Sequence, residues 1–182
     1  MQRTLLALAL LVLGSPFATA QESKPIKLKV GDKAPEFQGR TDEDKPWKSK
    51  DHVGKKILVV YFYPKDMTPG CTKQACNYRD MQKEFAEKDV EVIGVSGDTV
   101  ESHQKFKETE DLNFTLLADP EDKIAKAFGV PVKSVGENLF ASRWTFVVDR
   151  DGRVAHKDEK VDATKDTATV LKVVEKLEQA KS

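Results

Sequence analysis

Residues 61–76 read YFYPKDMTPGCTKQAC, and this stretch carries both the fold signal and the chemical signal of the chain. It completes an apolar run, Ile57–Tyr63, whose β-branched and aromatic residues predict a strand buried on both faces. Pro64 ends that run, and Thr68 with the proline after it suits the N-cap and the first position of a helix. The sequence therefore predicts a buried strand, a short loop and a helix with Cys71 in its first turn.

Cys71 is expected where backbone N–H groups have no acceptor within the helix. The N-terminus of a helix carries about half a positive charge, which favours the thiolate, the nucleophilic form of a cysteine. The same N–H groups can hold an anionic or peroxide oxygen. Cys71 is thus predicted to be a catalytic nucleophile.

Cys76 follows five residues after Cys71. In a continuous helix this spacing is ~7.5 Å along the axis and ~140° around it, so the Cα atoms are roughly 8 to 9 Å apart. A disulfide needs less than ~7 Å between Cα atoms. Two cysteines in an exported protein usually form a structural disulfide. Here a bond between them would require the helix to unwind, which favours a redox cycle.

The N-terminus has the order of a secretory signal peptide. Arg3 supplies a positive charge, an apolar run extends from Leu5 to Leu13, and Ala18-Thr19-Ala20 is a small-residue cleavage site. The run is much shorter than the ~20 residues of a membrane-spanning helix, although an uncleaved membrane anchor is the alternative. We expect an exported protein, periplasmic or extracellular, that is cleaved near Ala20 and does not insert into a membrane after processing.

Three parts of the chain follow from this interpretation: residues 1–20 as signal peptide, residues 21–30 as a flexible leader and residues 31–182 as one domain. In the domain, predicted strands and helices alternate, which predicts an α/β protein with a central mixed sheet flanked by helices. The predicted strands are Ile57–Tyr63, Val90–Val95, Phe114–Leu117, Trp144–Val148 and a weaker one from Arg153. The predicted helices are 71–88, one beginning with the capping-box-like Asp98-Thr99-Val100-Glu101, Pro120–Phe128 and 164–180.

The charge of the chain is balanced, with 30 basic and 30 acidic residues. Such a balance argues against a nucleic-acid partner or an anionic membrane surface. His52, His103 and His156 lie in polar sequence and are interpreted as surface residues. With only two cysteines besides, a structural zinc site is not expected.

The segment around Cys71 resembles the peroxiredoxin motif Pro-x-x-x-Thr-x-x-Cys, fulfilled by Pro64, Thr68 and Cys71. A second cysteine at the spacing of Cys76 is similar to the peroxiredoxin Q group, also called bacterioferritin comigratory proteins. Gln74 departs from that group, in which glutamate is usual. Further segments that resemble the family, in its order, are Val92–Ser96, Leu116–Asp119, Phe128–Val130 and Arg143–Asp149.

The resemblance implies a thioredoxin-like fold and a thiol-dependent peroxidase that reduces hydrogen peroxide and organic hydroperoxides without metal, haem or flavin. Cys71 would become sulfenic acid, and Thr68 would bind the sulfur and the peroxide. Arg143 would stabilise the thiolate, and Pro64 would shield the sulfenic acid. Cys76 would then form a disulfide with Cys71, and a thioredoxin-like dithiol would reduce it. The group also suggests a monomer.

Two other functions stay open at this point. A thioredoxin-like disulfide oxidoreductase of the cell envelope normally uses Cys-x-x-Cys, whereas four residues separate the cysteines here. A non-catalytic binding domain on the same fold is the second, and the complete set of Pro64, Thr68, Cys71 and Arg143 argues against it. Taken singly, Arg143 also fits a surface charge, Pro64 a strand end and Thr68 a simple helix cap.

Overall fold

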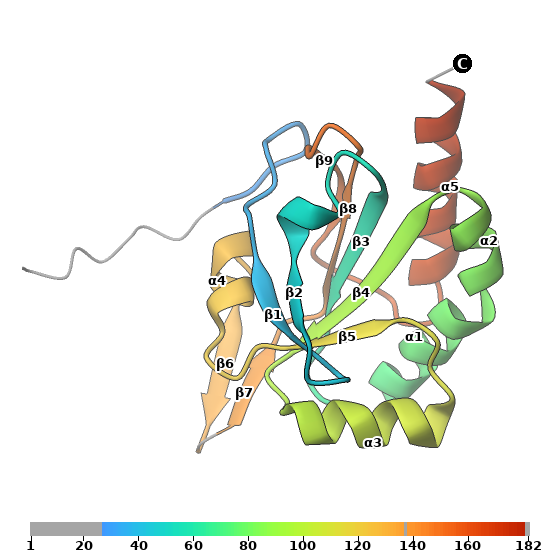
Figure 1. The fold of residues 1–182 in the computed structure, drawn as a ribbon. Helices are drawn as coiled ribbons and strands as arrows, with labels where there is room; N and C mark the ends of the chain where they lie inside the picture. Colours follow the sequence, from blue (N-terminus) through green and yellow to red (C-terminus); the bar gives the residue numbers. More distant parts are fainter. Residues whose placement is uncertain (1–26, 137, 181–182) are drawn as a thin grey trace, which may run out of the picture.

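The computed structural model describes residues 27–136 and 138–180, so the predicted signal peptide and most of the predicted leader lie outside the described residues. Within this part of the chain, a seven-stranded mixed sheet has the order β2-β1-β5-β4-β3-β8-β9 (Figure 1). The strands are β1 Gln38–Thr41, β2 Pro46–Lys48, β3 Ile57–Phe62, β4 Val90–Ser96, β5 Thr115–Ala118, β6 Val132–Val135, β7 Asn138–Ala141, β8 Trp144–Val148 and β9 Val154–Asp158. The helices are α1 Pro69–Asp80, α2 Gln82–Glu87, α3 Val100–Glu110, α4 Lys123–Phe128, α5 Asp166–Gln179 and the short 3-10 helix Ser49–Asp51.

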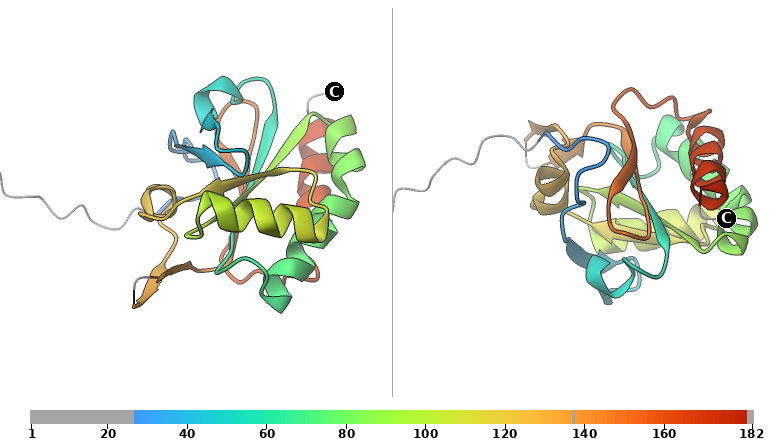
Figure 2. Two further views of the ribbon diagram at one scale, coloured as in Figure 1. Left: turned by 60° about the horizontal axis from the view of Figure 1, so that its bottom comes forward. Right: turned by 90° about the horizontal axis from the view of Figure 1, so that it is seen from above.

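Strand β3 lies in the interior of the sheet, parallel to β4 on one side and antiparallel to β8 on the other. All six of its residues are buried, because helices cover both faces of the sheet (Figure 2). Val60 and Phe62 point into a core shared with α4, whereas Val59 and Tyr61 point into a core shared with α1, α2, α3 and α5. This two-sided burial explains why the strand is one continuous apolar run.

The α/β class, the thioredoxin-like fold and the mixed sheet are confirmed. Each of the four main predicted strands is found within one residue of its expected ends, and the weaker fifth is β9. The predicted helix Pro120–Phe128 is shorter than expected. It begins at Lys123, because Asp122 has a φ of 51°, outside the right-handed helical region.

The prediction of a single helix over residues 71–88 is wrong. The helix begins at Pro69 and is interrupted at Met81, which has φ −96° and ψ 4°, so that α1 and α2 are separate. Tyr78 of α1 and Phe85 of α2 are both fully buried, with their ring centres 5.9 Å apart. Both cysteines lie in the unbroken part, α1.

The prediction of three surface histidines is wrong for His103, which is fully buried. It lies three residues before Phe106 in α3, and residues at this spacing share one face of a helix. That face packs on the sheet, so the polar flanks of His103 in the sequence did not reveal its burial. His52 and His156 are half-buried.

The strands that the sequence analysis did not predict are short and partly exposed. Strands β6 and β7 form a hairpin outside the main sheet, beside α4 (Figures 1 and 2). The hairpin occupies most of residues 131–142.

The described part of the predicted leader is packed rather than loose at one position. Leu28 is buried, and its carbonyl accepts a hydrogen bond from Nζ of Lys157 at 2.8 Å. The packed chain therefore begins no later than Leu28. None of the helices among the described residues has the length and apolar character needed to cross a bilayer.

Candidate active site at the N-terminus of α1

Cys71 lies in the first turn of α1, directly after the loop that leaves β3. The backbone of Thr68 is extended at the N-cap, and proline occupies the first helical position, as predicted. Cys71 itself is 1% exposed and packs with Ala75 and Tyr78 in the core beneath the helix. The nucleophile is therefore held on a rigid element at the positive end of a helix dipole.

Arg143 reaches Cys71 from the connection between β7 and β8. Its Nη2 lies 3.2 Å from Sγ of Cys71. The antiparallel register explains this contact, because Phe62 and Trp144 are directly opposite in β3 and β8. The chain that leaves β3 after Phe62 and the chain that enters β8 before Trp144 therefore lie at the same end of the two paired strands. The two predicted residues, 72 positions apart, are brought together here.

A buried polar chain continues from Arg143 away from the sulfur. Nη1 of Arg143 donates to Oε1 of Gln74, and Nε2 of Gln74 donates to Oδ2 of Asp166 at 2.6 Å. The same carboxylate oxygen accepts from the hydroxyls of Tyr78 at 2.8 Å and Thr145 at 2.9 Å. Burial raises the pKa of Asp166 above its ordinary value, while these three hydrogen bonds act in the opposite direction.

A second buried carboxylate, Asp66, braces the loop between β3 and α1. It accepts hydrogen bonds from the hydroxyls of Tyr63 and Ser102, each at 2.7 Å, and from Nδ1 of His103 at 2.9 Å. Its backbone N–H donates to Asp98 at 2.9 Å. The loop is thereby tied to α3 and to the end of β4.

The predicted start of α3 is wrong in one detail. Asp98, expected to open a capping box, instead accepts hydrogen bonds from the active-site loop and from Ser96. Thr99 is the N-cap, and its Oγ1 accepts from the backbone N–H of Ser102 at 3.3 Å. Met67, between the brace and α1, has a φ of 56°, a left-handed conformation that costs energy for a residue with a side chain.

Thr68 and Pro64 occupy the predicted places in the loop, and both are half-buried. The hydroxyl of Thr68 donates to the carbonyl of Lys65 at 3.0 Å and does not cap the helix, so the expectation of a side-chain cap is wrong. The hydroxyl group already satisfies a loop carbonyl, and an approaching peroxide would compete with that contact.

Cys76 is half-buried on the side of α1 that faces α3. Its Sγ donates to Oε2 of Glu110 at 3.6 Å. Burial raises the pKa of the Cys76 thiol above the ordinary 9.0; the charge of Arg79 lowers it and that of Glu110 raises it further. Both cysteines are free thiols in the structure. They thus differ in environment, Cys71 beside a cation and Cys76 beside a carboxylate.

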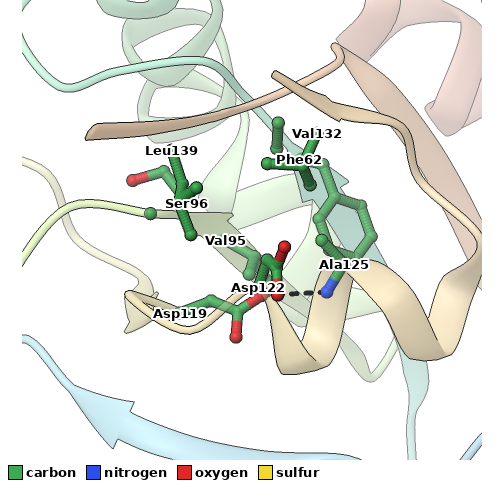
Figure 3. Close-up of a pocket in the computed structure, with 10 residues that line it drawn as sticks. Phe62, Val95, Ser96, Asp119, Asp122, Ala125, Val132 and Leu139 are labelled. Carbon is green, nitrogen blue, oxygen red and sulfur yellow. Dashed lines mark hydrogen bonds between the residues drawn. The ribbon is translucent and has the colours of Figure 1, made fainter. Parts of the chain in front are cut away.

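The small cavity drawn in Figure 3 is not a peroxide site. It has a volume of about 10 Å³ and lies between Phe62, Val95 and Leu139, on the face of the sheet opposite Cys71. Asp119 borders it and is engaged by the backbone N–H groups of Ile124 and Ala125. A space of this size holds one water molecule at most. Among the described residues, no three His, Cys, Asp or Glu side chains gather to hold a metal ion.

Sequence reasoning missed the two buried carboxylates, Asp66 and Asp166. Asp66 lies inside the motif, but the motif names only its proline, threonine and cysteine. Asp166 lies in the last helix, and nothing in its local sequence connects it to Cys71. The glutamine at position 74, where the family usually has glutamate, was a signal in the sequence that could have pointed to Asp166. A buried amide needs a hydrogen-bond partner for each of its ends.

In this structure an arginine contacts the sulfur of a cysteine at a helix N-terminus, and both belong to a thioredoxin-like fold. This arrangement defines a class of thiol peroxidases, the peroxiredoxins. The family model for the AhpC/TSA family matches residues 30–157. The chain belongs to the AhpC/TSA family.

Within that family, the similarity is to the Bcp and peroxiredoxin Q proteins. Peroxiredoxin Bcp of Bacillus subtilis (strain 168) is 43% identical over 155 residues, which cover 84% of this chain and 98% of that protein. The chloroplastic peroxiredoxin Q of Oryza sativa subsp. japonica is 39% identical over 152 residues, covering 83% of this chain and 69% of that protein. The chain is thus a peroxiredoxin of this group, and its activity is that of a thiol peroxidase.

Solved structures agree with this assignment. Peroxidoxin BcpB from Mycobacterium tuberculosis superimposes with a TM-score of 0.76 at 32% identity, covering 82% of this chain and 97% of that one. The bacterioferritin comigratory protein of Xanthomonas campestris, studied for its alkyl peroxide reduction activity in trapped intermediate and ligand complexes, has a TM-score of 0.71 at 28% identity. That comparison covers 77% of this chain and 90% of the other.

Proposed function

We propose that this chain reduces hydrogen peroxide and organic hydroperoxides to water and alcohols, with Cys71 as the peroxidatic nucleophile. The observation that carries the proposal is the 3.2 Å contact between Nη2 of Arg143 and Sγ of Cys71 at the start of α1. A fixed guanidinium charge and a helix N-terminus both stabilise negative charge at the reacting atoms. The alkyl peroxide reduction activity of the Xanthomonas campestris protein supports organic hydroperoxides as substrates.

In the first step, the Cys71 thiolate attacks one oxygen of the hydroperoxide. An S–O bond forms, the O–O bond breaks, and the leaving oxygen takes a proton to become water or an alcohol, which leaves a sulfenic acid. The guanidinium of Arg143 stabilises the negative charge that moves from sulfur to oxygen. Thr68 exchanges its hydrogen bond to Lys65 for one to the peroxide, and Pro64 limits the access of water.

In the second step, the Cys76 thiol condenses with the sulfenic acid, forming the disulfide and releasing water. The intact α1 holds the two sulfurs apart, so its first turns must open before the bond forms. An external dithiol then reduces the disulfide by thiol–disulfide exchange through a mixed disulfide. A thioredoxin-like protein supplies this dithiol.

The signal-peptide pattern in residues 1–20 supports export, with cleavage near Ala20. The thioredoxin-like donor then belongs to the periplasm or the cell surface, and the peroxiredoxin acts there as a monomer.

The test is turnover of hydrogen peroxide and of cumene hydroperoxide by residues 21–182 with a panel of thioredoxin-like donors. Oxidation of one equivalent of donor dithiol to its disulfide per peroxide consumed, lost entirely in Cys71→Ser, is the expected result. Insulin reduction by the same protein, without peroxide turnover, would instead identify a disulfide oxidoreductase.

A further inference from the structure

We propose that Asp166 is a positioning residue for the peroxidase reaction. Through the amide of Gln74, it holds the guanidinium of Arg143 on the sulfur of Cys71. The inference rests on the proposed function of Cys71 and Arg143 and assigns a role to a residue of the last helix.

These contacts form an unbroken line of hydrogen bonds inside the protein, the buried polar chain that begins at Arg143. Asp166 is 3% exposed, and Gln74 is not exposed at all. Oδ2 of Asp166 accepts from Nε2 of Gln74 at 2.6 Å, Oε1 of Gln74 accepts from Arg143, and Arg143 contacts Sγ of Cys71 at 3.2 Å. Water does not reach the amide, so its two ends depend on these partners.

The chemistry of the two partners determines which way the amide of Gln74 faces. A guanidinium only donates hydrogen bonds, and an ionised carboxylate only accepts them. If the amide turned over, its NH₂ group would face the N–H groups of Arg143 and its oxygen would face Asp166. Two buried mismatches of this kind are costly. The carboxylate of Asp166 therefore keeps the amide oxygen on Arg143.

The neutral amide also affects the charge around Arg143. Among residues 27–136 and 138–180, no carboxylate lies within ion-pair distance of its guanidinium. The positive charge is therefore directed at Cys71, and the nearest negative group along the line, Asp166, is one amide further away. A glutamate at position 74 would place two carboxylates in direct contact, and one of them would have to take up a proton.

Asp166 also joins three elements, because Tyr78 of α1 and Thr145 of β8 donate to the same oxygen. A purely structural role would affect stability and rate together. The proposed role affects the rate through Gln74 alone. The experiment therefore compares the loss of rate with the loss of stability in each variant.

The experiment measures the second-order rate of Cys71 oxidation by hydrogen peroxide, its pH profile and the thermal melt. Asp166→Asn removes the charge at nearly constant shape and is expected to slow oxidation about 10- to 100-fold, as small misplacements of catalytic groups do. Gln74→Glu is expected to slow it as well. The double variant Gln74→Glu/Asp166→Asn exchanges carboxylate and amide, restores a donor–acceptor match along the line, and is expected to be faster than either single variant.

Tyr78→Phe is the matched control, since it removes one hydrogen bond to the same oxygen of Asp166 from an equally buried site. Its melting temperature should fall while its rate of oxidation and pH profile stay near those of the wild type. If Tyr78→Phe and Asp166→Asn lose rate in proportion to their loss of stability, Asp166 is structural and the inference fails.

Should Asp166→Asn not fold, Gln74→Glu and the double variant decide alone, because a double variant no faster than Gln74→Glu overturns the inference. The proposed function fails separately, if wild-type protein does not oxidise at Cys71. If oxidation of the wild type requires Cys71 and Asp166→Asn is oxidised at the full rate, the proposed function stands. Only the role of Asp166 is then disproved.

Discussion

Cys71 and Cys76 are free thiols on one unbroken helix, α1, and they face different surroundings. Cys71 is buried under Arg143, whereas Cys76 contacts Glu110 of the neighbouring helix α3. A disulfide between them is incompatible with this helix, because five helical residues separate their Cα atoms by more than ~7 Å. The resting structure is therefore set up for the first chemical step and must change for the second.

The first prediction concerns that change. One equivalent of peroxide should consume both thiols and lower the far-UV helical signal by about one to two turns, since α1 must open. Amide exchange over residues 68–80 should become faster in the oxidised protein, while β3 and β8 stay protected. An oxidised protein with a Cys71–Cys76 disulfide and a fully protected α1 would contradict the geometry.

The second prediction concerns the cation at the sulfur. Arg143→Met should slow the reaction with peroxide by about 10²- to 10³-fold, the usual cost of removing one charge-stabilising group, and should lower the melting temperature because Oε1 of Gln74 loses its buried donor. Stopped-flow oxidation of Cys71 measures it. Arg150→Met is the control, because Arg150 is also largely buried but pairs with Glu178 instead. That variant should lose stability and keep its rate of oxidation. Equal rates for Arg143→Met and the wild type would remove Arg143 from the mechanism.

The sequence predicted those parts of the site whose residues are close together in the chain, and missed contacts between residues far apart in the chain. Cys71, its helix and the strand before it follow from local signals: a continuous apolar run, a proline, a cap and a spacing. Arg143 came from the resemblance alone, since only the register of β3 against β8 brings it to the sulfur. Ser102 and His103, which bind Asp66, lie on α3, and Asp166, which binds Gln74, lies on α5. No local pattern identifies such pairs.

The fold shows the same division. Buried strands such as β3 and β8 were predicted closely because nearly every residue in them is β-branched or aromatic. The short strands β1 and β2 and the hairpin β6–β7 depend on neighbours for their pairing. The break at Met81 was invisible because neither glycine nor proline marks it, and Met81 and Gln82 are themselves good helix formers. His103 was misjudged because its partner, Asp66, is 37 residues away.

The third prediction follows from the raised pKa of Cys76. A thiol whose pKa lies above 9.0 is almost entirely protonated at pH 8, so iodoacetamide should label Cys76 slowly there and faster as the pH rises past 9. Glu110→Gln removes a charge and a hydrogen bond that both raise this pKa, so the labelling at pH 8 should become faster. The measurement uses a Cys71→Ser background, and Glu108→Gln on the exposed side of α3 is the control. Equal labelling in both variants would show that Glu110 does not affect the thiol.

The fourth prediction tests export. Protein isolated from the native envelope should begin at Gln21, in part cyclised to pyroglutamate, because the small residues that end at Ala20 form the cleavage site. Intact mass is the measurement. Replacing Ala18 and Ala20 with bulky residues should leave an unprocessed chain in the membrane fraction. Soluble protein that keeps Met1 would disprove the signal peptide.

The last prediction separates the two thiols by their chemistry. Cys71→Ser should abolish peroxide reduction, because no thiolate remains at the start of α1. Cys76→Ser should complete the first step at the wild-type rate but accumulate sulfenic acid, which more peroxide oxidises to sulfinic acid, visible by intact mass as two added oxygen atoms. Added glutathione should restore part of the turnover, because an external thiol can attack the trapped sulfenic acid in place of Cys76. If Cys76→Ser cycles normally with the dithiol donor and no added thiol, Cys76 does not resolve the intermediate, and the opening of α1 has no part in the reaction.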